Sequence, residues 1–283
     1  EHNAPRSHAS MLVDHLVVDR AYGGRFQPKE GWRYTVARGL RKAWDVLEDK
    51  HPETDEHKPF IRESAAAANP NCLQCKSQDH ILRWKFLGDK DPQAKWDRTS
   101  NVVQLARTLQ NGLNCFYCHD PHGAKPRIVR DGLIAALTRP EKDTLWHKDP
   151  KATKVSVKEF RGGFRKIGIL SKYDAKLQCG QCHVEYNCNP GTEHSSGAKV
   201  GLADSRTNHF PFKDVFEMFE HYNKLDFGDF KHALTGALLL KAQHPEAEAF
   251  WNSKHDKAGI SCNDCHMPKV KNSAGKTYTS HWQ

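Results

Sequence analysis

Apolar side chains recur every three or four positions in several segments of the chain, which is the period of a helix that buries one face. The segments with this pattern cover residues 10–20, 35–50, 101–110 and 229–243. Alternation of apolar and polar positions, the mark of a half-buried strand, is scarce. Stretches rich in glycine, proline, serine and charge at 21–32 and 188–206 indicate loops. The pattern predicts a mainly α fold with long connections.

The apolar content of the chain is low for its size. The chain has 283 residues, of which 37% are hydrophobic, and its mean hydropathy is -0.78. No apolar run reaches the roughly 18 residues that a membrane-spanning helix needs. Aliphatic side chains alone would make a thin core for one large domain or two small ones. We therefore expect another group to fill the interior.

The cysteines indicate what that group is. They form four pairs, each separated by two residues: Cys72 and Cys75, Cys115 and Cys118, Cys179 and Cys182, and Cys262 and Cys265. Three pairs run directly into a histidine, at His119, His183 and His266. CxxCH is the attachment motif of c-type haem. Its spacing puts both thiols on one helical face, where they reach the porphyrin edge while the histidine turns under the iron.

Zinc ribbons and structural disulfides are the alternatives for paired cysteines. Zinc would use two pairs for each ion and has no need of a histidine after three of the four. Disulfides between cysteines three positions apart are uncommon outside redox motifs. We therefore predict a multihaem cytochrome c with at least four haems, organised around the covalently bound haem cluster rather than around a sheet. The expected attachment sites are 72–76, 115–119, 179–183 and 262–266.

The formal net charge of +9 is of the size found in nucleic-acid-binding proteins. Each haem brings two propionates, however, so four haems add about eight negative charges and nearly neutralise the protein. We expect many of the 43 Lys and Arg side chains to pair with propionates, and we predict neither nucleic-acid binding nor a membrane span. Thiols that await haem favour assembly outside the cytoplasm, most simply in a bacterial periplasm.

The first cysteine pair reads CLQCK, so Lys76 stands where the other motifs have histidine. One interpretation is that the neutral Lys76 amine ligates iron, because burial beside a ferric centre disfavours ammonium. The alternatives are a haem whose proximal histidine comes from elsewhere, or a cysteine pair without haem. A haem with an unusual proximal ligand and an open distal face is a place for substrate.

Several separated motifs occur in the order found in one enzyme family. They are NAPRSH at 3–8, CLQCK at 72–76, QCHVEY at 181–186, LLKAQHPE at 239–246, CNDCHMPKV at 262–270 and YTSH at 278–281. Over nearly its whole length the chain resembles the ammonia-forming cytochrome c nitrite reductases. The long segment 20–76 and the position of Cys188, two residues after Tyr186, resemble the octahaem branch rather than the pentahaem enzymes.

The resemblance implies a distal pocket of Arg20, Tyr186 and His244 at a haem ligated by Lys76. A guanidinium and an imidazole can bind the oxygens of nitrite, and a phenol can donate a hydrogen bond or a proton. The octahaem branch joins the tyrosine to the cysteine, so a cross-link between Tyr186 and Cys188 is expected. On residue type alone, Arg20 could clamp a propionate, Tyr186 could be a buried aromatic side chain and Cys188 a buried thiol.

The resemblance also implies a calcium site beside this pocket. Glu185 would bind calcium through its carboxylate and Gln243 through its amide oxygen, with the backbone carbonyls of Tyr186 and Lys241 completing the protein ligands. An all-oxygen shell suits a hard cation.

The remaining irons are implied to be bis-histidine electron carriers. Their proximal ligands would be His119, His183 and His266. The resemblance assigns His281 as the distal ligand of the haem at 115–119 and His8 as that of the haem at 179–183. His255 matches a ligand of a last haem whose own motif is absent here, and nothing matches the distal ligand of the haem at 262–266. Residues 1–283 are therefore expected to be a portion of the catalytic multihaem domain, without an N-terminal haem domain and a C-terminal helical part.

Together these features predict the six-electron reduction of nitrite to ammonium. Hydroxylamine and sulfite are expected as further substrates, a partner cytochrome or a membrane quinol dehydrogenase as the electron donor, and a homo-oligomer as the assembly. An octahaem oxidoreductase of the tetrathionate or hydroxylamine type is one alternative. A non-catalytic electron conduit is the other, and it would hold only six-coordinate, low-spin haems.

Overall fold

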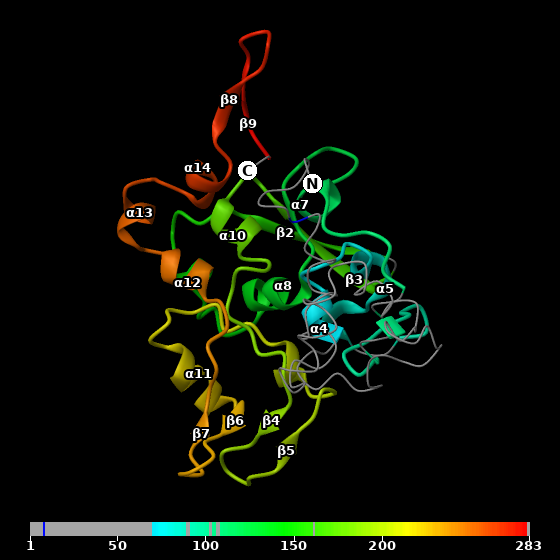
Figure 1. Ribbon diagram of the computed structural model, residues 1–283, viewed down its shortest axis with the longest axis vertical. Coiled ribbons are helices and arrows are strands. Elements are labelled where there is room, and N and C mark those ends of the chain that lie inside the picture. The colour runs from blue at the N-terminus through cyan, green and yellow to red at the C-terminus, as the bar shows by residue number, and fades with distance from the viewer. Residues whose placement is uncertain are drawn as a thin grey trace, which may run out of the picture.

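The computed structural model describes residues 8, 70–88, 91–101, 104–105, 108–160 and 162–281 (Figure 1). The helical segments are α4 (Pro70–Leu73), α5 (His80–Arg83), η2 (Phe86–Gly88), α7 (Cys115–Cys118), α8 (Asp131–Thr138), α9 (Leu145–Lys148), α10 (Ala175–Cys179), η3 (Ser205–Asn208), α11 (Met218–Lys224), α12 (Glu246–Phe250), α13 (Lys254–Lys257) and α14 (Cys262–His266). The strands are β1 (Arg127–Ile128), β2 (Val155–Phe160), β3 (Arg165–Leu170), β4 (Gly191–Thr192), β5 (Lys199–Val200), β6 (Phe230–Lys231), β7 (Leu238–Leu239), β8 (Lys269–Lys271) and β9 (Thr277–Thr279). The predicted helices at 10–20 and 35–50 and the predicted loop at 21–32 lie outside these residues.

A three-stranded antiparallel sheet supports the core, with the strand order β1-β3-β2. Strands β2 and β3 pair residue for residue along their whole length. The turn between them contains Gly162 and Gly163, whose φ angles of 64° and 90° favour glycine because it has no side chain to clash. Strand β1 adds to the other edge of β3 and leads directly into α8.

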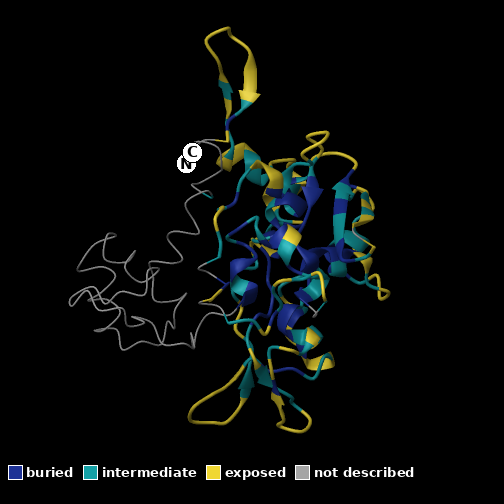
Figure 2. Ribbon diagram, turned by 90° about the vertical axis from the view of Figure 1, so that its right-hand side faces the viewer, coloured by how far each residue is buried: buried dark blue, intermediate teal, exposed yellow. Residues whose placement is uncertain are grey.

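Helix α8 packs against β3 and anchors the main apolar cluster. Its side chains Leu133 and Ile134 are fully buried, and they share the cluster with Leu170 from β3. Gly132 lets the helix approach the ring of Phe210, because a Cβ at this position would lie 2.5 Å from a ring carbon. In Figure 2 the buried residues gather in this middle part of the body.

The helices that carry the cysteine motifs are single turns with local caps. Asn114 accepts a hydrogen bond from Phe116 N at the start of α7, and Asp174 caps α10 in the same way. Ser261 and Asp264 form a capping box at α14. An isolated turn of helix is unstable in water, so these caps and tertiary packing hold the motifs in shape. In the part of the chain that the structure describes, no helix is long and apolar enough to cross a bilayer.

Three hairpins extend from the body, β4–β5 and β6–β7 at one end and β8–β9 at the other (Figures 1 and 2). The segment 229–243, predicted as a helix, forms the β6–β7 hairpin instead. Its apolar residues follow a helical period, but Gly236 adopts a φ of 72°, which no helix contains. The predicted loop 188–206 is mostly irregular and contains β4 and β5. Of the segment 101–110, only residues 104 and 105 are described as helical.

The prediction of a mainly α fold is wrong. Helices account for 29% of the structure and strands for 18%, and α8, the longest helix described, has 8 residues. The missed signal is the alternation in VSVKEF and RKIGIL on either side of a Gly-Gly turn, which is typical of a hairpin. The described core is organised by the sheet and α8, which corrects the expectation that a haem cluster rather than a sheet organises the fold.

Candidate functional site

The CLQCK segment is held in one tight turn. Helix α4 contains Cys72, and the turn that follows carries Cys75 and Lys76. A hydrogen bond of 3.0 Å from Lys76 N to Leu73 O closes it. Cys75 is buried, whereas Cys72 and Lys76 are half-buried. Both thiols and the lysine amine therefore come from one short piece of backbone, as attachment of a single group requires.

Sulfur atoms from different motifs lie next to each other. Cys75 is hydrogen-bonded to Cys182, and Cys179 to Cys262. The hydroxyl of Tyr117, inside the CFYCH motif, lies 3.6 Å from Cys182 Sγ and donates a hydrogen bond of 3.1 Å to a carbonyl of CLQCK. The fold thus brings all four cysteine motifs into one neighbourhood, although they lie far apart in the sequence.

Two pairs of imidazoles stand at a separation that fits a haem iron between them. The ring centroids of His8 and His183 are 6.1 Å apart, and those of His119 and His281 are 6.2 Å apart. Two metal–nitrogen bonds of about 2 Å, plus the distance from each nitrogen to its ring centre, require roughly 6 Å. His119 Nδ1 lies 3.0 Å from Ala124 O, which leaves Nε2 for a metal. These residues therefore fit two bis-histidine haems.

The histidines assigned to the other haems are not paired in this way. His266 on α14 and His255 on α13 are both exposed, and no second imidazole stacks or tilts against either ring among the described residues. The motif at 262–266 joins the others through the contact of Cys262 with Cys179.

Tyr186 and His244 lie together near the CLQCK motif. Their ring centroids are 5.3 Å apart, and the charges of Cys75 and Lys76 act on His244. Tyr186 is 3% exposed, and burial raises its pKa well above the usual value, so the phenol keeps its proton at neutral pH. Burial lowers the pKa of His244, which leaves the imidazole neutral. Arg20, the third residue of the predicted pocket, lies outside the described residues.

The guanidinium that the structure places beside Tyr186 belongs to Arg130. It lies 5.5 Å from the centroid of the Tyr186 ring and 5.1 Å from that of Phe210. It donates to Asp131 Oδ1 at 2.8 Å and to the side-chain oxygen of Gln74, within CLQCK. Sequence reasoning missed Arg130, because its neighbouring aspartate and the apolar run that follows were the only local signals of a buried ion pair.

The residues of the predicted calcium site lie close together. Glu185 Oε2 accepts a hydrogen bond of 2.6 Å from Gln243 N, and Gln243 Nε2 donates one of 3.1 Å to Tyr186 O. The charge of Lys241 acts on Glu185. If the amide nitrogen and oxygen of Gln243 exchanged positions, its side-chain oxygen would point towards Tyr186 O, where the predicted calcium would lie. In the described part of the chain no three His, Cys, Asp or Glu side chains form a metal site, so a cation here would depend on amide and backbone oxygens.

Two further carboxyl groups, missed by sequence reasoning, lie beside Glu185. Glu248 is buried and accepts a hydrogen bond of 3.0 Å from Glu185 N, and Asp229 acts on Glu185 electrostatically. Burial raises the pKa of Glu185 to about 7, that of Glu248 to about 8, and also that of Asp229. Buried acids side by side disfavour one another's charged forms, and a cation would relieve that repulsion.

Cys188 lies between the first motif and the calcium residues. Its sulfur is 4.0 Å from Cys72 Sγ and 3.3 Å from Gln243 Nε2. It belongs to the same buried cluster as Tyr186, and its charge contributes to the raised pKa of that phenol. The two residues of the predicted cross-link are thus neighbours within the site.

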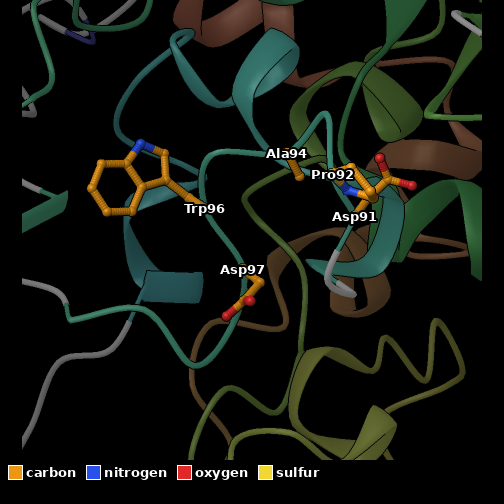
Figure 3. Close-up of a pocket in the computed structure, with 5 residues that line it drawn as sticks. All are labelled: Asp91, Pro92, Ala94, Trp96 and Asp97. Carbon is orange, nitrogen blue, oxygen red and sulfur yellow. The ribbon is translucent and has the colours of Figure 1, made fainter.

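A pocket of about 310 Å³ lies on a different part of the chain. It is lined by Asp91, Pro92, Ala94, Trp96 and Asp97. In Figure 3 the Trp96 ring and the Asp91 carboxylate point in opposite directions from one loop. The pocket contains none of the cysteines, histidines or carboxyl groups described above, so we do not assign it to the site.

Comparisons with known proteins point to one family. The model of the cytochrome c552 family matches residues 30–283. A cytochrome c-552 of Parabacteroides distasonis is 31% identical over 214 residues, which cover 74% of this chain and 35% of that protein. The chain therefore spans about a third of the length of this relative.

The buried carboxyl groups predict that stability depends on pH. Folding raises the pKa of Glu248 from 4.5 to about 8, so the unfolded chain releases this proton first, and the free energy of unfolding falls as the pH rises from about 4.5 to about 8. Glu248→Gln keeps the acceptor for Glu185 N and removes the charge. We therefore expect the stability of this variant, measured by thermal unfolding in the presence of a chelator, to fall less over that range.

Glu141→Gln is the matched control, because Glu141 is exposed and lies between α8 and α9, outside the group of buried carboxyl groups. This variant should follow the parent at every pH. The same slope for Glu248→Gln and the parent would show that Glu248 does not have a raised pKa.

Proposed function

The chain belongs to the cytochrome c552 family, and we propose that it forms part of an enzyme that reduces nitrite to ammonium with six electrons. Its family makes it a cytochrome c, which carries haem c and takes part in electron transport. The observation that carries the proposal is the position of Tyr186 and His244 beside CLQCK, the motif with lysine in place of histidine. Two groups that can give protons thus lie beside the place where electrons would arrive.

Cys72 and Cys75 would hold the reactive haem, with Lys76 as its axial ligand. When bound, this haem would supply an iron centre that passes electrons to nitrite. A lysine amine donates a σ pair without the π system of imidazole, so it would set the properties of this iron apart from those of the histidine-ligated ones. The single turn that carries all three residues supports this assignment.

Tyr186 and His244 would bind the nitrite oxygens and supply protons. The phenol is protonated at neutral pH and can donate, and the neutral imidazole can donate from one ring nitrogen. Arg130 lowers the pKa of Tyr186 against the effect of burial, which makes the phenol a better proton donor than burial alone would allow. Because Tyr186 is buried, a hydrogen bond from its hydroxyl is stronger than it would be in water.

Electrons would reach this site through haems held by the two histidine pairs. His183 pairs with His8 and His119 with His281. The contacts of Cys182 with Cys75 and of Cys179 with Cys262 would bring the haem at 179–183 next to those at 72–76 and 262–266. A partner cytochrome or a membrane quinol dehydrogenase would be the donor, the protein would be exported before haem attachment, and it would form a homo-oligomer. Cell fractionation and light scattering test the last two points.

Calcium would be bound beside Tyr186 by Glu185, Gln243 and the carbonyls of Tyr186 and Lys241. Removing it with a chelator should lower the thermal midpoint of the haem-loaded protein by on the order of 5 °C, as expected for loss of a ligand that binds only the folded state. Glu185→Gln should abolish this response to chelator, and the exposed Glu246→Gln should keep it. A protein that contains no calcium by elemental analysis, and whose midpoint ignores the chelator, would contradict the site.

Tyr186 and Cys188 would be joined by a covalent bond, as in the octahaem branch. Mass spectrometry of the digested protein should then find one fragment two hydrogens lighter than the unlinked peptides. Cys188→Ser should restore the unlinked mass, and it provides the control. Full alkylation of Cys188 in the denatured parent would refute the bond and move the chain towards the pentahaem branch, while nitrite reduction would remain possible.

The assignment of Lys76 predicts the largest effect on turnover. Lys76→Leu removes the axial side chain and should nearly abolish ammonium formation from nitrite with reduced viologen as donor. Lys76→His should keep the haem attached at Cys72 and Cys75 but lower the rate, with the spectra of the other haems unchanged. Lys172→Leu, at an exposed lysine outside the site, is the control and should turn over like the parent.

Haem counts by mass spectrometry check that every variant is fully loaded. Ammonium formation by Lys76→Leu at the parental rate would place the reaction elsewhere. If the parent shows only low-spin haem that neither nitrite nor cyanide perturbs, the protein is a non-catalytic electron conduit.

A further inference from the structure

A second cluster of buried basic side chains borders CLQCK, and of its members only Arg130 also acts in the proposed reaction. Arg130, Arg165 and His80 line a small internal pocket together with Gln74 and Tyr117. Arg165 comes from β3 and His80 from α5, and both are almost fully buried, at 2% and 3% exposure. The pocket therefore gathers charged groups from separate elements, at a place where solvent cannot stabilise them.

Several donors in this pocket lack a hydrogen-bond partner. These are Nε and Nη1 of Arg165 and Nε of Arg130, together with the ring of His80, whose one N–H in the neutral form also has no partner among the described groups. Arg165 uses only Nη2, which donates to Val129 O. Each unsatisfied buried polar group costs about 1–3 kcal/mol, and the cost is higher for a charged one. So many orphaned donors at one point indicate a missing acceptor.

The charge of the pocket is unbalanced as well. Asp131 is the one buried carboxylate described between the two arginines, at 2.8 Å from Arg130 and 3.8 Å from Arg165. Asp79 acts on His80 from the surface, where it accepts hydrogen bonds from the amides of the 110–111 turn. Burial, followed by the two arginines, lowers the pKa of His80 to about 3, so its ring is neutral. The hydrogen bond to Cys182, and after it the charge of Arg130, lowers the pKa of the Cys75 thiol, but Cys75 has no charge once it forms a thioether. Two cations and one buried anion then leave one positive charge uncompensated, which costs several kcal/mol without an anionic partner.

We propose that Arg165, with Arg130 and His80, binds a carboxylate, and that this group is a propionate of one of the attached haems. Guanidinium and carboxylate form paired, charge-assisted hydrogen bonds. The side chains close on one another without room for a water molecule, so the carboxylate would enter by displacing them, as the end of a tethered group can and a separate haem-sized molecule cannot. Gln74 and Tyr117 belong to two haem motifs, so propionates are the buried carboxylates that haem attachment brings nearby. This inference depends on haem c and not on nitrite reduction.

The test is a redox titration of the haem-loaded protein, followed by its visible spectrum. Arg165→Gln removes the positive charge at the propionate. One midpoint potential should fall, because the oxidised haem is then favoured, and it should become pH-dependent near neutrality as the propionate gains a proton on reduction. The matched control is Lys166→Gln, which removes the same charge from the next residue of β3, where the side chain is 38% exposed. All its potentials should equal those of the parent.

Arg165→Lys keeps the charge without the paired hydrogen bonds, so the same midpoint potential should fall by less. If Arg165→Gln does not load haem, the proposal is tested with Arg165→Lys alone. Unchanged potentials in the loaded Arg165 variants would overturn the proposal. Equal shifts in Arg165→Gln and Lys166→Gln would also overturn it, since the effect would then be one of net charge alone. If the parental potentials depend on added formate or chloride and Arg165→Gln loses that dependence, the guest is a free anion and not a propionate.

Discussion

The buried guanidinium of Arg130 connects parts of the chain that are remote in sequence. It donates to Gln74 in the first cysteine motif and to Asn208, and its Cζ lies over the ring of Tyr186 at 5.5 Å from the centroid. Asp131 balances its charge and also receives a backbone N–H at the start of α8. Removing one partner of a buried ion pair costs about 3–5 kcal/mol. The position of CLQCK relative to Tyr186, and with it any chemistry at this site, therefore depends on one buried ion pair.

The parts of the site that could be predicted from the sequence are those whose residues lie within one helical turn of each other. CxxCH needs residues at i, i+3 and i+4 on one helical face, and α7, α10 and α14 are short helices at these motifs. Pairing across the chain is different, since no spacing rule connects His119 to His281 or His183 to His8. Those assignments rest on the resemblance of separated motifs to one family. The ring separations of 6.1 and 6.2 Å are consistent with them.

The parts that could not be predicted depend on burial and on long-range pairing. The apolar period at 229–243 is equally compatible with two short strands, and Gly236 in its turn decides between them. Charged side chains are exposed by default, so nothing in the sequence marks Arg165 or Glu248 as buried, and the only signals for Arg130 are the aspartate and the apolar run that follow it. Their burial can be explained only from their partners in the structure. Asp131 is the partner of both arginines, and the backbone N–H of Glu185 is the partner of Glu248. Sequence reasoning thus predicted the attachment points of the site and missed the buried charged residues around them.

Within the segment 181–188, neighbouring side chains contact the apolar cluster and the buried carboxyl groups in turn. Val184, Tyr186 and Cys188 all enter the main apolar cluster, whereas Glu185 bonds to Gln243 and Glu248 outside it. From 184 to 188 buried apolar and polar side chains alternate, so a period of two serves both environments at once. Tyr186 consequently lies between a region of excess positive charge around Arg130 and a group of buried carboxyl groups around Glu185. A shift of this segment by one residue would exchange the two sides, burying the carboxylate among apolar groups and removing the phenol from His244. The register of this one loop, fixed by the haem motif at its start, therefore sets the electrostatics of the whole site.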